Sequence, residues 1–120
     1  MTPRDAAAVA RALLADATVE KMIALHLTTT HQLIAVHVVS TGTLDTTLVN
    51  PRNVFQAALL SNAAGLMLVH NHPSGDPVPS PDDLAVAQRL RAVAILLGID
   101  LLDFLIIGDG AYYSFREAGL

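Results

Sequence analysis

The chain has 120 residues, of which 52% are hydrophobic and 15% charged, and it carries a formal net charge of −4. This length suits a single domain over residues 1–120, and the apolar content is sufficient for a packed core, which excludes a disordered chain. The sequence contains no cysteine. Disulfides and thiolate metal sites are therefore excluded, and a bound metal must be held by imidazole and carboxylate groups.

The distribution of charged and apolar residues also limits the partners. The seven basic residues are spread along the chain and aromatic residues make up only 4%, so direct binding to nucleic acid is not expected. The apolar runs are too short for a membrane span or a signal peptide. We therefore expect a cytoplasmic protein without a membrane partner, and we leave open whether it forms a homo-oligomer.

The first half of the chain predicts a helix followed by a hairpin. Thr2 and Asp5 form a capping-box pattern, so a helix is expected from there to about Asp16. Residues 20–27 and 33–39 are rich in Ile, Leu and Val and predict two strands of a hairpin. Residues 44–49 have the composition of a short edge strand.

The second half alternates helices and strands. Asn50-Pro51 begins a helix that we expect to reach about residue 63, and the apolar run 66–70 follows as a buried central strand. Ser80-Pro81 begins a helix that ends at Gly98. Strands are expected over 101–107 and 111–115, joined by a tight turn. The predicted class is α/β, with a mixed sheet between helices.

The stretch from His70 to Asp83 carries the chemistry. His70 and His72 are two residues apart, so in extended backbone both imidazoles face one side and can converge on one ion. Asp83 returns in the first turn of the following helix. Two imidazoles and one carboxylate leave the fourth position of tetrahedral Zn²⁺ open, an arrangement typical of hydrolytic zinc.

Structural explanations exist for each part of this pattern. Most His-x-His pairs bind nothing, and Asp76 fits a turn beside Gly75. Ser80 and Asp83 form an ordinary capping box, which is compatible with a metal site because it fixes both side chains near the start of the helix. The spacing of the whole stretch is what favours zinc.

That spacing resembles a known family. The JAMM (MPN+) metalloprotease motif has the same pattern: His-x-His, seven residues, Ser, two residues, Asp. The sequence of residues 70–80 as a whole is similar to the RadC family of JAB domains. Further similarity covers nearly the whole chain, at residues 42–44, 51–55, 62–64, 101–103 and 105–110. The helix-hairpin-helix modules that precede this domain in full-length RadC proteins have no counterpart in the sequence.

The resemblance implies a cytidine-deaminase-like three-layer α/β/α sandwich, the JAB/MPN fold. It implies that His70, His72 and Asp83 bind Zn²⁺ and that Ser80 hydrogen-bonds the zinc water or the tetrahedral oxyanion. The implied reaction is hydrolysis of a peptide or isopeptide bond by zinc-bound water. The motif does not specify the peptide or protein substrate.

Two positions depart from the family pattern. The usual general-base Glu, counted back from Gly42, is replaced by His37, and the nearest acidic residues along the chain are Glu20 and Asp45. His37 could act as the base, as an additional ligand, or as an inert polar residue. Phe104 stands where relatives often have His, either near the site or in the core.

These features leave three functional hypotheses. The first is a zinc-dependent metallopeptidase of the JAMM type whose activity is weakened at position 37. The second is a catalytically impaired zinc-binding or interaction module. The third, a DNA-repair-associated protein, is disfavoured by the acidic balance and the dispersed basic residues.

Overall fold

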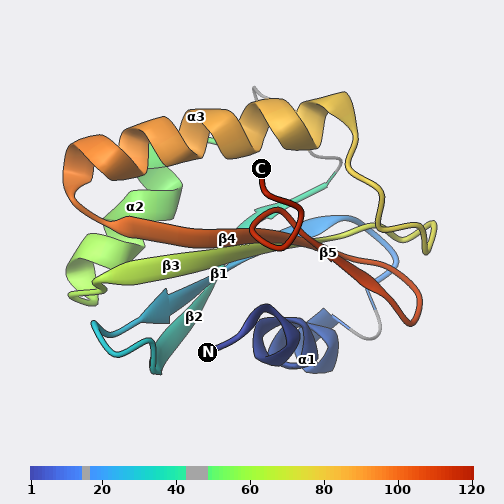
Figure 1. The fold of residues 1–120 in the computed structure, drawn as a ribbon, viewed down its shortest axis with the longest axis horizontal. Helices are drawn as coiled ribbons and strands as arrows, with labels where there is room; N and C mark the ends of the chain where they lie inside the picture. Colours follow the sequence, from blue (N-terminus) through green and yellow to red (C-terminus); the bar gives the residue numbers. More distant parts are fainter. Residues whose placement is uncertain (15–16, 43–48) are drawn as a thin grey trace.

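The computed structural model describes residues 1–14, 17–42 and 49–120. A five-stranded sheet separates α1, on one face, from α2 and α3 on the other (Figure 1). The elements are α1 (Pro3–Leu14), β1 (Lys21–Leu27), β2 (Leu33–Thr41), α2 (Pro51–Leu60), β3 (Gly65–Asn71), α3 (Pro81–Leu97), β4 (Asp100–Ile107) and β5 (Tyr112–Ser114). The predicted α/β class and three-layer arrangement are confirmed.

The sheet has the strand order β2-β1-β3-β4-β5 and is mixed. The β3–β4 pair is parallel and is connected through α3, whereas the other neighbouring pairs are antiparallel. Antiparallel pairing aligns Met22 of β1 with His70 of β3, so the start of β1 lies beside the end of β3. This register brings the segment just before β1 to the His-x-His stretch.

Strand β3 lies at the centre of the sheet and is buried along its whole length. One core cluster fills the space between the sheet and α2 and α3, with Phe55, Leu68 and Leu90 among its members. A second cluster packs α1 against the opposite face, with Ala6, Ala10 and Val69 among its members. Each fully buried large aliphatic side chain contributes roughly 1.5–3 kcal/mol, so the two clusters fix the central strand firmly.

Helix starts follow the capping chemistry expected from the sequence. Thr2 and Asp5 exchange hydrogen bonds of 3.1 and 3.0 Å at the start of α1. The Asn50 side chain accepts the Arg52 N–H, and Ser80 and Asp83 form a reciprocal capping box. Gly98 ends α3 with a φ of 71°, a left-handed conformation that glycine adopts without strain.

One predicted helix ends earlier than expected, and parts of two predicted elements lie outside the described residues. Helix α2 ends at Leu60 rather than near residue 63, because Asn62 adopts a φ of 55° and breaks the helical backbone before β3 begins at Gly65. The edge strand expected over 44–49 lies, apart from Val49, outside the described residues, as does Asp16 at the expected end of the first helix. None of the described helices has the length and hydropathy that a membrane crossing requires.

Candidate metal centre

Two histidines mark the end of β3. His70 is the penultimate residue of the strand and is 1% exposed, and His72 follows the strand, with its N–H donating to the Ile107 carbonyl at 2.9 Å. The extended backbone turns both side chains the same way, so their ring centroids lie 5.1 Å apart in an edge-on arrangement. The structure therefore confirms that the two imidazoles converge.

Asp83 joins the two rings from the first turn of α3. Its Oδ1 lies 3.1 Å from His70 Nδ1, and its Oδ2 lies 3.1 Å from His72 Nε2. The carboxylate is 0% exposed. Burial alone would raise the pKa of Asp83, but the hydrogen bonds from His70 and Ser80 outweigh it and lower the pKa from 3.8 to about 2. Asp83 is therefore an ionised carboxylate between two imidazoles.

Ser80 holds this carboxylate in place. The Ser80 N–H and hydroxyl both donate to Asp83 Oδ2, at 2.7 and 2.9 Å, while the Asp83 N–H donates back to Ser80 Oγ at 3.1 Å. A serine hydroxyl has one proton, and here that proton is engaged by Asp83. The role of Ser80 at a developing oxyanion thus stays a prediction, and it requires this hydroxyl to turn away from the carboxylate.

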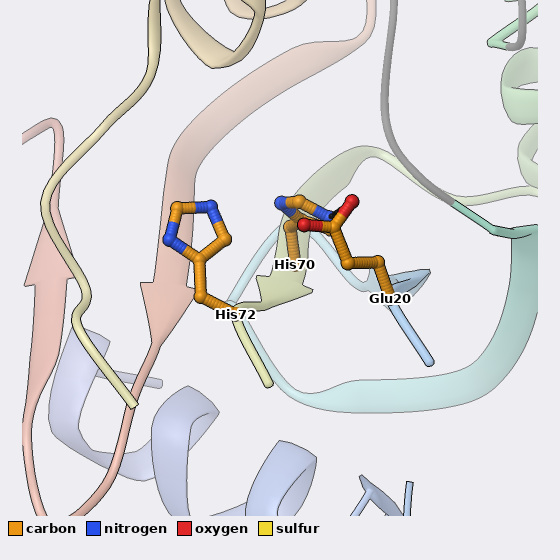
Figure 2. Close-up of side chains that lie close together, drawn as sticks. All are labelled: Glu20, His70 and His72. Atoms are coloured by element: carbon orange, nitrogen blue, oxygen red, sulfur yellow. Dashed lines mark ion pairs between the residues drawn. The ribbon is translucent and has the colours of Figure 1, made fainter. Parts of the chain in front are cut away.

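A second carboxylate approaches from the opposite side. Glu20 Oε2 lies 3.7 Å from His70 Nε2, and Figure 2 shows the His70 ring between Glu20 and His72. One ligand atom from each of Glu20, His70 and His72 lies within 4.8 Å of the others, which makes these residues a candidate metal-ligand group. Glu20, one of the two nearest acidic residues along the chain, is therefore brought beside His70 by the fold.

Asn71 places Glu20 at the site. Its Oδ1 accepts the Lys21 N–H at 2.6 Å and its side-chain amide donates to the Val19 carbonyl at 3.1 Å, so it binds the backbone on both sides of Glu20. The Asn71 side chain is buried, at 6% exposed. The middle residue of the His-Asn-His stretch therefore ties the segment before β1 to the end of β3.

His37 lies elsewhere on the sheet. It pairs with Ala24 in the β1–β2 ladder, its ring centroid is 6.3 Å from that of His26, and it lines a hollow beside α2 with Asn53 and Gln56. His37 is not a member of the candidate metal-ligand group, whereas Glu20 is. Glu20 directly precedes β1, the antiparallel neighbour of β3, and this position brings its carboxylate beside His70.

Two smaller expectations are resolved by the structure. The Asp76 carboxylate accepts the Val78 N–H at 3.0 Å and orders the loop, while the Asp76 carbonyl lies 2.9 Å from His72 Nδ1 and orients that ring. Phe104 is 3% exposed and packs against Phe115 at a centroid distance of 5.0 Å, so it belongs to the core.

The donor set fits a cation. His72 Nδ1 faces the Asp76 carbonyl oxygen and therefore donates a proton to it, which leaves Nε2, 3.1 Å from Asp83 Oδ2, as the nitrogen that can bind a metal ion. His70 faces a carboxylate on each side, and its buried Nε2 has no hydrogen-bond partner among the described residues. Ligand atoms around tetrahedral zinc lie roughly 3.3 Å apart, close to the separations of Asp83 from both rings.

The fold and this site define a class, the JAB-type α/β domain with a candidate metal-ligand group of histidine and carboxylate side chains. A family model described as RadC-like JAB domain matches residues 1–120, and the chain belongs to that family.

Relatives agree. A UPF0758 protein of Methanosarcina acetivorans is 45% identical over 118 residues, covering 98% of this chain and 52% of the relative. One from Methanosarcina mazei is 49% identical over 100 residues, covering 83% of this chain and 44% of the relative. One from Shouchella clausii is 42% identical over 118 residues, covering 98% of this chain and 51% of the relative. The chain spans about half the length of the curated relatives it matches.

Proposed function

We propose that the chain is a metal-dependent hydrolase of peptide or isopeptide bonds. The observation that carries this proposal is the contact between the Glu20 carboxylate and the buried His70 Nε2 at 3.7 Å, because it supplies a proton acceptor beside the two imidazoles. His70 and His72 would hold the metal ion, for which zinc suits the donor set. A zinc ion held there supplies a Lewis acid that acidifies water and polarises a carbonyl.

The two carboxylates have different tasks in this proposal. Asp83 is fully buried, is kept ionised by its hydrogen bonds and touches both imidazoles, so we assign it as the third ligand. The Glu20 side chain is 25% exposed and its Oε2 lies 3.7 Å from His70 Nε2, so we assign it as the general base. It accepts the proton of the attacking water and delivers it to the leaving amine.

The remaining residues position these groups. Asn71 fixes Glu20 through the backbone on either side of it, and Ser80 fixes Asp83 through three hydrogen bonds. The Asp76 carbonyl holds the His72 ring in one orientation. Outer contacts of this kind fix the tautomer and the direction of ligating imidazoles. Two of the three proposed ligands, His72 and Asp83, and the proposed base Glu20 are therefore held in place by groups outside the metal site.

The test combines metal content with hydrolysis. Protein purified without chelator should contain about one zinc per chain. On a library of fluorogenic peptides and lysine isopeptides, Glu20→Gln should lower the rate by roughly 10²–10⁴-fold with zinc retained. The matched control His37→Gln should leave the rate unchanged. Protein that ignores added zinc, or a Glu20→Gln variant with the parental rate, would contradict the proposal.

A second candidate function is an interaction module built on the same fold. The observation that favours it is the large exposure of apolar side chains away from the metal centre, with Leu60 at 78%, Ile95 at 73% and Leu96 at 86%. Zinc binding without hydrolysis of any library member, together with unchanged zinc content in Glu20→Gln, would favour this function over the first.

A further inference from the structure

A hollow of about 310 Å³ lies behind the metal-binding stretch, on the α1 side of the sheet. One wall is formed by Arg11 and Leu14 of α1, a second by the segment 71–75, and a third by the turn 108–110 between β4 and β5. His72 borders this hollow and also belongs to the metal-ligand group. A ligand in the hollow would therefore lie against the loop that carries a metal ligand.

Arg11 is the basic group of this hollow. Its Nη2 is buried and has no hydrogen-bond partner among the described residues. Asp109 lines the same hollow, yet no ion pair within 4.0 Å joins these two side chains. Leaving the buried Nη2 donor without a partner is costly, so a turn of the half-buried guanidinium toward an acceptor bound in the hollow would stabilise it.

The geometry points to a carboxylate as the ligand. We propose that the hollow binds a carboxylate group of the polypeptide substrate, with Arg11 as the residue that recognises it; the identity of the ligand as substrate rests on the proposed hydrolase function. A planar guanidinium pairs with a carboxylate through two parallel hydrogen bonds. A phosphate, which carries more negative charge, is disfavoured because Arg11 is accompanied by Asp109.

The walls of the hollow are held together by backbone contacts. The Asp109 N–H donates to the Gly75 carbonyl at 2.8 Å, and a Cβ added at Gly108 would clash with that same carbonyl. The metal-binding loop and the β4–β5 turn are thus packed backbone to backbone, and only glycine fits at 108. A carboxylate bound to Arg11 therefore meets a preformed surface, which limits the entropy lost on binding.

The experiment is an NMR titration of the whole chain as purified. Amide signals of Gly108 and Gly110 report on the hollow. The probes are N-acetyl-trialanine with a free carboxylate, the same peptide as its amide, and an amide with glutamate as the central residue. We expect one of the two carboxylate peptides to give saturable shifts that the neutral amide does not. Saturable shifts with the free-carboxylate peptide would identify the ligand as a chain terminus. Saturable shifts with the glutamate peptide would identify it as an acidic side chain.

The variants assign the binding to Arg11. Arg11→Gln should lower the affinity for the carboxylate peptide about tenfold or more, because bidentate hydrogen bonds between charged groups are stronger than those between neutral groups. Arg4→Gln, at an exposed position of the same helix, should bind like the parent. Arg11→Lys keeps the charge without the fork and should bind with intermediate affinity, even if the Gln variant does not fold. Asp109→Asn should tighten binding severalfold because it removes a like charge.

Several results would overturn the inference. These are equal shifts with the neutral amide, absence of saturation with both acids, unchanged affinity in Arg11→Gln or Arg11→Lys, and weaker binding in Asp109→Asn. Because the titration reads binding in the hollow and needs neither hydrolysis nor bound zinc, loss of the hydrolase proposal would leave these results interpretable. If carboxylate peptides bind but no peptide is hydrolysed, the carboxylate site at Arg11 stands and only the identification of its ligand as a substrate is rejected.

Discussion

The molecule contains two pairs of imidazoles on the same face of the sheet, and they differ in what surrounds them. The first pair is His70 and His72, with centroids 5.1 Å apart, and the second is His26 and His37, with centroids 6.3 Å apart. Each pair has one buried Nε2 without a hydrogen-bond partner among the described residues, on His70 and on His26. Burial and an unpaired ring nitrogen therefore do not distinguish a metal centre from a core histidine.

The carboxylates make the difference. Glu20 and Asp83 both contact His70, whereas His26 Nδ1 meets the Ser61 hydroxyl at 3.0 Å, and this hydroxyl also donates to the Ala58 carbonyl. Burial lowers the pKa of His26, and the neighbouring His37 lowers it further, so both disfavour the charged form of the ring. The first pair can hold a cation because two carboxylates contact His70, whereas His26 of the second pair meets a serine hydroxyl.

The largest expected effect is on metal binding. Asp83→Asn keeps the shape of the side chain but removes its charge, so zinc affinity should fall on the order of 100-fold or more. The matched change in the second pair, His26→Gln, should leave zinc binding unchanged. Competition with a chromophoric chelator measures both. Equal losses in the two variants would remove the distinction between the pairs.

The next effect concerns the placement of Glu20. Asn71→Ala leaves the Lys21 N–H and the Val19 carbonyl without their partner, which should cost about 1–3 kcal/mol of unfolding free energy. Asn53→Ala, at an exposed position of α2, should stay within about 0.5 kcal/mol of the parent. Urea unfolding gives the energies, and faster hydrogen exchange at Lys21 locates the loss. An unchanged Lys21 amide would contradict the role of Asn71.

Two helix caps allow a finer comparison. Ser80→Ala and Asn50→Ala each remove an N-cap side chain and should each cost about 1 kcal/mol. Only Ser80→Ala should raise the pKa of Asp83, because it removes a hydrogen bond that stabilises the ionised form. A pH titration of Asp83 by NMR in both variants checks this. A rise in Asn50→Ala as well would point to a general loosening of the fold.

The smallest expected effect is a pH dependence in the second pair. The folded-state pKa of His26 is lowered from 6.5, so below about pH 6.5 the unfolded state binds more protons than the folded state. The stabilising contribution of neutral His26 is complete above that pH and is lost as the pH falls. His26→Leu should flatten the decline in urea midpoint between pH 7.5 and 5.5, and His37→Gln should flatten it less. Identical slopes in all three proteins would contradict this.

Most of the fold could be predicted because local signals mark its elements. The caps at Thr2, Asn50 and Ser80, the apolar run of β3 and the glycine after α3 all correspond to the observed boundaries within a few residues. The convergence of His70, His72 and Asp83 could also be predicted, since a strand end and the following helix start fix all three within one short stretch. Local chemistry decides these features.

Glu20 could not be found in the same way. It reaches His70 through the antiparallel β1–β3 register, which joins segments about fifty residues apart along the chain. Counting back from Gly42 leads to His37 in β2, whereas Glu20 lies just before β1. One signal was available: an acidic residue immediately before a strand, and a polar Asn71 at the end of another strand, capable of joining them.

The β1–β3 register also means that the proposed base Glu20 reaches the metal site only when the sheet has formed. The metal ligands proposed here lie within fourteen consecutive residues, 70–83, so they can approach one another before the rest of the chain is ordered. Glu20 arrives only when β1 has paired with β3, and a slip of two residues would carry it roughly 7 Å away. In the proposed hydrolase, a newly made or partly unfolded chain would therefore hold an ion yet lack the group that accepts the proton.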